Sequence, residues 1–262
     1  MAKAMLIDVS KCIGCRACQV ACKEWNDLPG EETDNWGSYE NPPDLSPNTW
    51  NRIAFREIER EGGQVAWLFW PVRCMHCTDA PCVRVCPTGA LFKDPLGFTA
   101  YDASKCNGCG YCTQFCPFGI PRLKETDFWG KGKATKCTFC QDRVTNGQIP
   151  ACAKACPTGA IEYGDRNELV AEGRARVQAL KGRGLTEANL YGENLLGGLG
   201  MMYVLTDPPS VFDLPEDPSG ALADVWQSWI QPLGGIAIGA TAVGLLLNFL
   251  VARRQIKVEE EV

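Results

Sequence analysis

The chain has 262 residues and a formal net charge of -5 at pH 7; 16 residues are cysteine and one is histidine. A negative chain without a basic tail or stripe is unsuited to nucleic-acid binding, and its length allows one elaborated domain or two fused modules. The cysteines divide without remainder into four groups of four, a pattern unlike a disulfide framework. The composition therefore predicts four sites of four cysteines each.

The first cysteine group follows a predicted short strand at residues 5–9 and reads C-x₂-C-x₂-C-x₃-C. Residues 1–7 contain neither a long apolar region nor a twin-arginine pair, so no export signal is expected. Residues 8–15 are echoed by residues 102–109. This internal repeat predicts an α+β fold of duplicated bacterial ferredoxin-like modules.

An insertion at residues 26–70 separates the first two groups and is rich in Trp, Asn, Pro and Gly. It is predicted to be an ordered loop followed by a hairpin, with strands at 53–58 and 65–70 joined at Gly62-Gly63. Its tryptophans either cover clusters and fill a small core or form a subunit interface, where tryptophan is enriched.

The first group is Cys12, Cys15, Cys18 and Cys22, the second Cys74, Cys77, Cys82 and Cys86, the third Cys106, Cys109, Cys112 and Cys116, and the fourth Cys137, Cys140, Cys152 and Cys156. A hairpin is predicted between the second and third groups, within residues 88–101. The third group reads C-x₂-C-x₂-C-x₃-C-P, as in bacterial ferredoxins, where the fourth cysteine reaches a second iron–sulfur cube. A third cysteine at the same spacing has no natural place around a tetrahedral zinc ion. The pattern therefore favours iron–sulfur clusters, which take soft thiolate ligands, over zinc.

The crossing of the fourth cysteine also predicts which cysteines share a cluster. The second and third groups are adjacent and should pair with each other, which leaves the first and fourth groups to pair around them as an enclosing module. The predicted sites are site a (Cys12, Cys15, Cys18, Cys156), site b (Cys22, Cys137, Cys140, Cys152), site c (Cys74, Cys77, Cys82, Cys116) and site d (Cys86, Cys106, Cys109, Cys112). Two nested modules with a row of four [4Fe-4S] clusters are suited to electron transfer and offer no site for bond-making chemistry.

Several other side chains lie close to the cysteines in the sequence. His76 is either a residue that tunes a cluster potential or a neutral imidazole satisfied by the backbone. Six basic residues could offset cluster charge, although a solvated surface role is as plausible for several of them: Lys11, Arg16, Lys23, Arg73, Arg84 and Lys105.

Beyond the predicted cluster domain at residues 1–164, the sequence changes character. A helix is expected at 167–181, where apolar residues recur at helical spacing and glycine follows. The rest of the extension, which runs over 165–232, is expected to be mostly irregular, with a possible strand at 201–205.

Residues 233–252 contain no charged side chain and would span about 30 Å as a helix, the thickness of a hydrocarbon core. We predict one transmembrane helix here; a buried core helix is the alternative. Trp226 and Trp229 precede it, and Arg253 and Arg254 follow. The positive-inside rule puts the tail at 253–262 in the cytoplasm and the cluster domain on the far side.

The sequence resembles the four-cluster ferredoxin subunits of complex iron–sulfur molybdoenzymes, and within them the beta (iron–sulfur) subunits of respiratory membrane-bound formate dehydrogenases. The resemblance covers almost the whole chain. It is carried by residues 6–27, which end in Trp25-Asn26-Asp27, and by residues 41–46, 74–77, 106–122, 137–143 and the C-terminal span.

This resemblance implies an electron-transfer subunit without a catalytic site of its own. A separate alpha subunit with a molybdenum or tungsten pterin would oxidise formate, and a cytochrome b gamma subunit in the bilayer would reduce quinone. The family pairing of cysteines agrees with sites a to d. The chain would be a single-pass protein of the cytoplasmic (inner) membrane with its cluster domain in the periplasm, exported folded by a partner's twin-arginine signal.

Two other functions are compatible with parts of the pattern. The same relay could serve a hydrogenase or a sulfur-compound reductase, against which only the stretches between residues 25 and 46 argue. A membrane-tethered structural zinc protein is the alternative from a different class.

Overall fold

The computed structural model describes residues 1–60, 62–125 and 132–255, in two compact units, 1–220 and 221–262. The first unit contains a four-stranded sheet in the order β8-β1-β10-β9. Its strands are β1 (Lys3–Asp8), β8 (Ile161–Asp165), β9 (Asn189–Tyr191) and β10 (Met201–Leu205). Strand β1 pairs parallel with β10 and antiparallel with β8, so the sheet joins the start of the chain to residues that follow the last cysteine.

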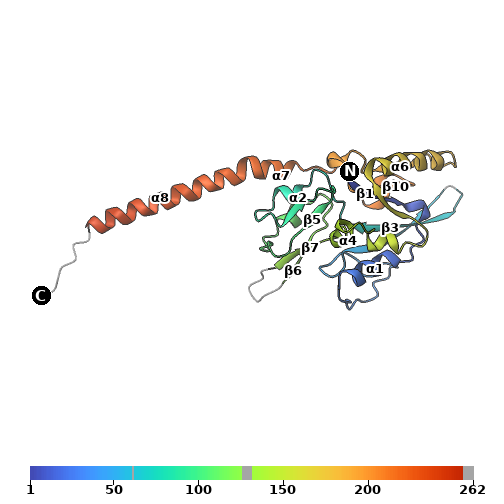
Figure 1. The fold of residues 1–262 in the computed structure, drawn as a ribbon, viewed down its shortest axis with the longest axis horizontal. Coiled ribbons are helices and arrows are strands. Elements are labelled where there is room, and N and C mark those ends of the chain that lie inside the picture. The colour runs from blue at the N-terminus through green and yellow to red at the C-terminus, as the bar shows by residue number, and fades with distance from the viewer. Residues whose placement is uncertain (61, 126–131, 256–262) are drawn as a thin grey trace. The chain divides into compact units, whose positions relative to one another are not determined.

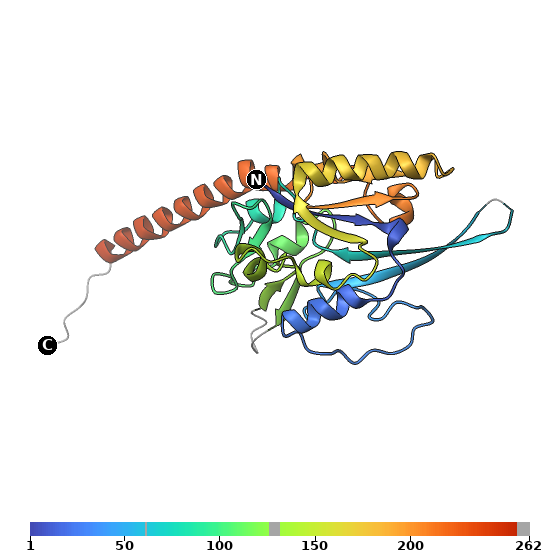
Figure 2. The same ribbon diagram turned by 45° about the vertical axis from the view of Figure 1, so that its right-hand side comes forward.

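Side chains alternate across this sheet, as the two-residue period of a strand requires. Leu6 and Met202 pack against helix α6 (Arg166–Lys181), whereas Met5 and Tyr203 enter the larger core on the opposite face. The hydroxyl of Tyr203 donates to the carbonyl of Pro71, which ties that face to strand β3. Helix α6 and the β2–β3 hairpin therefore lie on opposite sides of the sheet (Figure 2).

Three hairpins complete the strands of this unit. They are β2 (Asn51–Glu59) with β3 (Val65–Arg73), β4 (Leu91–Lys93) with β5 (Thr99–Tyr101), and β6 (Arg122–Glu125) with β7 (Gly132–Thr135). The first two lie where the sequence predicts hairpins. The third was not predicted, because its strands are short and lack a clear alternation of apolar and polar residues.

Short helices contain or adjoin many of the cysteines. They are α1 (Ala17–Trp25), α2 (Pro81–Arg84), α3 (Tyr111–Gln114), α4 (Gln141–Thr145) and α5 (Ala151–Lys154), and a 3₁₀ turn, η1 (Val9–Lys11), precedes the first group. The sequence repeat is also a structural repeat. Asp8 accepts hydrogen bonds from Ser10 N (3.0 Å) and Oγ (2.6 Å), and Asp102 accepts the same two from Ser104 at the same distances.

The extension after residue 164 differs from the expectation of a mostly irregular segment. The helix is present as α6 and the strand as β10, but β10 is central in the sheet and the first unit continues to Gly220. Residues 185–220 also contain β9 and the 3₁₀ turns η2 (Leu195–Gly197) and η3 (Pro209–Phe212). The reason is long-range contact: β10 is buried because β1 and β9 pair with its two edges, while α6 and the larger core cover its two faces.

The second unit consists of α7 (Ala221–Val225), the π-helical turn η4 (Trp226–Ile230) and α8 (Gln231–Gln255). Residues Ala221–Arg253 form one continuous helix that is long and apolar enough to cross a membrane, judged by length and composition. Its apolar side chains are exposed, including Leu233, Ile236 and Phe249. This is the candidate C-terminal membrane helix, and it contains the predicted span.

Candidate metal centres

All sixteen cysteines are free thiols, and they converge from distant parts of the sequence. One small cavity is lined by the four cysteines of site a, another by those of site d, and a third by those of site b. The thiols of site c interact electrostatically with one another, since Cys77 is influenced by Cys74, Cys82 and Cys116. The fold thus brings together each set of four, including the two pairs of groups that are far apart in the sequence.

Adjacent strands explain how the fourth cysteine reaches site a. Strand β1 leads into the first group and β8 follows Cys156, and Ile7 of β1 lies opposite Ile161 of β8. Gly14 lies in the tight turn of this group with φ +67°, and a Cβ there would meet the Phe69 and Phe55 rings at 3.0 and 3.1 Å. The Gly14 N–H donates toward Cys12, so glycine is required both for the turn and for the close approach.

At site d, the β4–β5 hairpin brings the fourth cysteine of one group to the first three cysteines of another. Strand β4 follows Cys86 and β5 leads into Cys106, with Leu91 opposite Tyr101. Ala134 N lies 3.4 Å from the Cys106 sulfur. Burial raises the pKa of Cys106, but hydrogen bonds from the N–H groups of Ala134 and Gly108 outweigh it and lower the pKa below its usual value. Backbone donors of this kind stabilise a thiolate, the form that binds metal.

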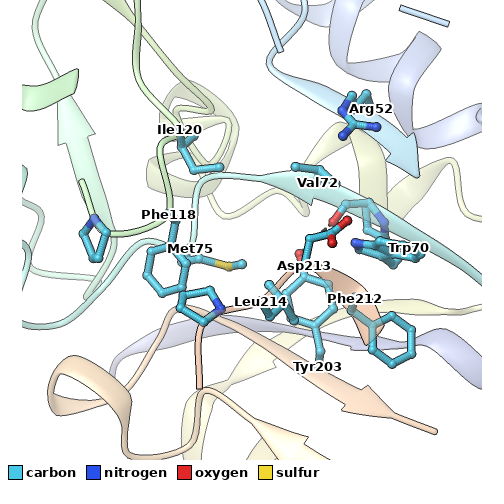
Figure 3. A pocket seen from close by; sticks show the side chains of 13 residues that line it. Arg52, Trp70, Val72, Met75, Phe118, Ile120, Tyr203, Phe212, Asp213 and Leu214 are labelled. Atoms are coloured by element: carbon cyan, nitrogen blue, oxygen red, sulfur yellow. Dashed lines mark hydrogen bonds between the residues drawn. The ribbon is translucent and has the colours of Figure 1, made fainter. Parts of the chain in front are cut away.

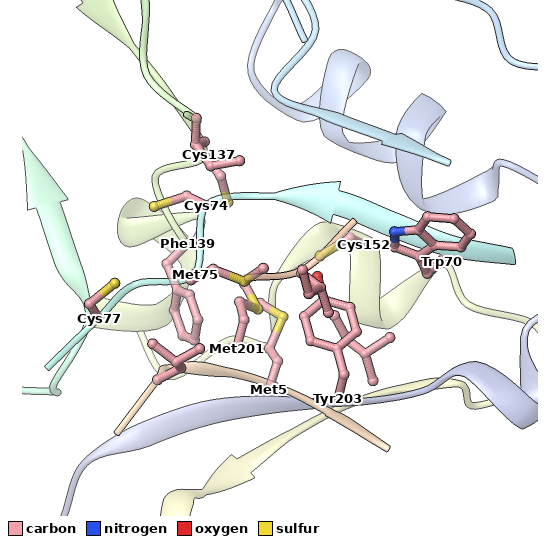
Figure 4. Packing of buried hydrophobic residues seen from close by; sticks show 14 of the residues in the cluster. Met5, Trp70, Cys74, Met75, Cys77, Cys137, Phe139, Cys152, Met201 and Tyr203 are labelled. Atoms are coloured by element: carbon pink, nitrogen blue, oxygen red, sulfur yellow. The ribbon is translucent and has the colours of Figure 1, made fainter. Parts of the chain in front are cut away.

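All cysteines of sites b and c are buried except Cys116, which is partly exposed. Figure 4 shows Cys74, Cys137 and Cys152 beside Met5 and Met201 in the core. Burial and then the neighbouring thiols raise the pKa of Cys77. Four thiolates in such a place need a cationic centre among them. Four thiols spread around a small cavity, as at site b, are the donor set of a [4Fe-4S] core.

Electrostatic contacts between sites give their order. Cys18 of site a is influenced by Cys152 of site b, Cys74 of site c by Cys137 of site b, and Cys82 of site c by Cys112 of site d. The sites therefore follow one another as a, b, c and d. Cys15 in site a and Cys109 in site d are exposed, so both ends of the row reach the surface.

Buried basic groups accompany the two middle sites. Arg73 is 1% exposed and its guanidinium lies 3.2 Å from the Cys152 sulfur. His76 is fully buried, and its Nε2 lies 3.5 Å from the Cys137 sulfur, so its ring faces a cysteine as well as the backbone. Burial, followed by the nearby Lys136 and Arg73 charges, holds the pKa of His76 well below its usual value, which keeps the imidazole neutral.

The other flanking cations have different partners. Lys11 pairs with Glu162 at 2.9 Å and Lys105 with Asp102 at 3.5 Å. Sequence reasoning missed Lys136, which is 3% exposed and donates to the carbonyls of Thr99 (2.8 Å) and Cys137 (2.9 Å). The available signal was its position directly before a cysteine, like Lys11 and Lys105, but burial distinguishes it from them.

A separate cavity of about 450 Å³ opens between β3, the loop after Cys116 and the segment before Gly220 (Figure 3). Its wall is largely apolar, with Trp70, Met75, Phe118 and Phe212 among the lining residues. No cysteine lines it, so it is distinct from the four sites, although Met75 and Pro117 are direct neighbours of the site c cysteines in the chain.

Comparison with known proteins agrees with this geometry. Two family models described as 4Fe-4S dicluster domain match residues 11–90 and 65–166, which together contain all sixteen cysteines. Two dicluster domains and sixteen cysteines account for four [4Fe-4S] clusters.

Individual relatives extend the match to nearly the whole chain. The nitrate-inducible formate dehydrogenase iron–sulfur subunit of Escherichia coli is 43% identical over 252 residues, 94% of this chain and 84% of the relative. The formate dehydrogenase iron–sulfur subunit of Haemophilus influenzae is 42% identical over 99% of this chain and 83% of its own length. Formate dehydrogenase 2 subunit beta (cytochrome c-553) of Nitratidesulfovibrio vulgaris is 39% identical over 70% of this chain and 85% of its own length. The chain therefore belongs to the family of formate dehydrogenase iron–sulfur subunits, which confirms the resemblance inferred from its sequence.

Proposed function

We propose that this chain carries electrons from a formate-oxidising catalytic subunit, through four [4Fe-4S] clusters, to a cytochrome b subunit that reduces quinone in the membrane. The observation that carries the proposal is the order of the sites: two sites without an exposed cysteine lie between two that each expose one. When bound, each cluster would accept and release one electron at a time. The chain's own part is to hold the clusters in sequence and to keep water from the middle ones.

The ligand sets of this proposal are the cysteines of sites a, b, c and d, arranged as two nested ferredoxin-like modules. Site d is enclosed by the β4–β5 hairpin, and site a by the pairing of β1 with β8. In the sequence, the paired strands β1 and β8 lie outside the β4–β5 hairpin, one before it and one after it. This order supports the nesting of one module within the other.

The two ends of the row would meet different partners. Gly220, the last residue of the first unit, accepts a hydrogen bond from Arg84 in α2, which contains Cys82 of site c and lies two residues before Cys86 of site d. The segment that leads to the membrane helix therefore leaves the unit beside sites c and d. We infer that electrons leave at site d.

Site a would then receive electrons from the catalytic subunit. Its Gly14 turn packs on Phe55 and Phe69, and the exposed rings of Tyr39 and Trp67 continue this aromatic surface. Aromatic side chains of this kind are enriched at protein interfaces. This aromatic surface is a suitable contact for the catalytic subunit. That subunit would hold molybdenum or tungsten as its metal.

The topology of the proposal follows from the charges around the span: the cluster domain faces the periplasm and the C-terminus the cytoplasm. The domain would cross the membrane folded, with a partner that carries the export signal. A periplasm-only reporter fused after Trp25 should be inactive without partner subunits, and activity there would contradict this route.

The test of the relay is anaerobic. The tagged chain is purified from membranes with its partners, formate is added, and cluster reduction is followed by electron paramagnetic resonance (EPR). Formate should reduce the clusters. If dithionite reduces them and formate does not, although a large partner is present, the relay stands but the donor is different, and hydrogen and sulfur compounds are tried next.

A further inference from the structure

We propose that Arg73 is the internal counter-ion of site b and raises the reduction potential of the cluster held there. This inference rests on the cluster assignment in the proposed function, but it does not depend on which substrate supplies the electrons. Arg73 would thereby influence the free energy of electron transfer through the cluster at site b.

The contacts of Arg73 are with sulfur. Its Nη1 and Nη2 each lie 3.2 Å from the Cys152 Sγ, and Nη2 also lies 3.9 Å from the Cys137 Sγ. Arg73 is the last residue of β3 and lies opposite Asn51 of β2, so a two-stranded ladder fixes its position.

No carboxylate of the described residues balances this buried charge: none lies within 4.0 Å of Arg73, and the Arg73 Nε has no hydrogen-bond partner. Two half-buried arginines of the same hairpin are arranged differently: Arg56 donates to both carboxylate oxygens of Asp213, and Arg60 to both of Asp207. Because an unpaired buried charge is costly, the geometry calls for an anion beside Arg73.

Site b would supply that anion. Its four thiolates outnumber the positive charges of an oxidised [4Fe-4S] core, so the loaded site is a net anion. Reduction adds one electron and therefore one further negative charge. A fixed cation at hydrogen-bond distance in a buried site stabilises the reduced form more than the oxidised form, which raises the potential.

The experiment is a redox titration of the purified complex by EPR, with dithionite and mediators rather than formate. Arg73→Gln removes the charge, Arg73→Lys keeps it, and Arg60→Gln is the control, an arginine already neutralised by Asp207. In Arg73→Gln, the ratio of reduced to oxidised cluster at one site should fall about tenfold at a fixed potential, which corresponds to about 59 mV for a one-electron couple. The other midpoints should move less, and the Arg73→Lys and Arg60→Gln titrations should stay near wild type.

Two further outcomes remain informative. If Arg73→Gln loses one cluster in iron content and EPR, while Arg73→Lys regains it, the charge is needed for loading and the proposal is supported. Unchanged midpoints in a fully loaded Arg73→Gln complex overturn the proposal. So does equal loss of the cluster in both variants, because shape rather than charge would then be what matters. Failure of formate to reduce the clusters affects the proposed function alone, since dithionite drives this titration.

Discussion

The middle of the cysteine row and its two ends differ in their surroundings. Sites a and d each expose one cysteine, and the lysines before Cys12 and Cys106 pair with carboxylates at the surface. Around sites b and c, Arg73, His76 and Lys136 are all buried, and their hydrogen bonds are with sulfur or backbone carbonyls. Sites a and d are therefore suited to exchanging electrons with partner subunits. The surroundings of sites b and c are suited to setting the reduction potentials of their clusters.

The largest effect is expected when a substitution creates a cavity in the core around sites b and c. Phe139 is fully buried, stacked on Phe98 at 5.3 Å and in edge contact with His76 at 4.8 Å. Phe139→Ala should destabilise the cluster domain by about 3–5 kcal/mol, because a large buried ring leaves a void. The measurement is iron release from the purified complex in guanidinium. Trp67→Ala, at a half-exposed ring near site a, is the matched change and should cost far less. Equal losses in the two variants would remove the distinction between middle and ends.

The second effect is expected at site d, where the backbone of Gly108 lies close to the backbone of Gly132. Gly108 has φ +74°, and a Cβ there would lie 2.2 Å from the Gly132 carbonyl oxygen. Gly108→Ala should therefore cost more than the roughly 1–2 kcal/mol that positive φ alone imposes, and it should disturb the site d EPR signal. Gly147 has φ +72° with nothing within 4 Å, so Gly147→Ala carries the conformational cost only. A Gly108→Ala complex as stable as Gly147→Ala would show that the loops move apart freely.

The rate of iron removal should also differ between sites a and d, which expose a cysteine, and sites b and c, which do not. Exposed thiols are the accessible points of attack, so mild oxidation with a chelator present should remove the clusters of sites a and d before those of b and c. The measurement is the order in which EPR signals disappear from the intact complex, and a severalfold difference in rate is expected. Simultaneous loss would mean that the domain opens as one unit before any iron leaves.

The smallest effect is a pH dependence at Glu31, whose partner Lys23 lies in α1. Burial raises the pKa of Glu31, but hydrogen bonds from Ser46 and Thr49 and the charge of Lys23 outweigh it, so the pKa is lowered. A lowered carboxyl pKa adds stability above the unfolded value, about 4.3, that is lost as pH falls through the folded value. Glu31→Gln should lower the thermal midpoint slightly at pH 7, and the difference from wild type should shrink as pH falls below about 4.3. A difference that is constant with pH would assign the effect to the lost hydrogen bonds rather than to charge.

The sequence could predict the parts that rest on local patterns. The cysteine spacing and its repeat identify the clusters, and the helix α6, the β2–β3 hairpin and the strand β10 follow from periodicity and turn residues. It could not predict that β10 pairs with β1, because residues about 200 positions apart carry no shared local signal. Nor could it separate Arg73 from the other flanking cations. Its burial depends on what packs over the end of β3, and this is a property of the tertiary structure.

The pairing of β1 with β10 has a consequence for synthesis. Leu6 lies beside Met202, so the first strand leaves the ribosome long before its neighbour exists. At 5–20 residues per second, that interval is about 10–40 s. Site a also waits for Cys156, which lines the same cavity as Cys12. In the proposed ligand sets, the cysteines of sites c and d are therefore complete once Cys116 has been made, whereas site a is complete only at Cys156. Whatever protects the first cysteines has to act during translation.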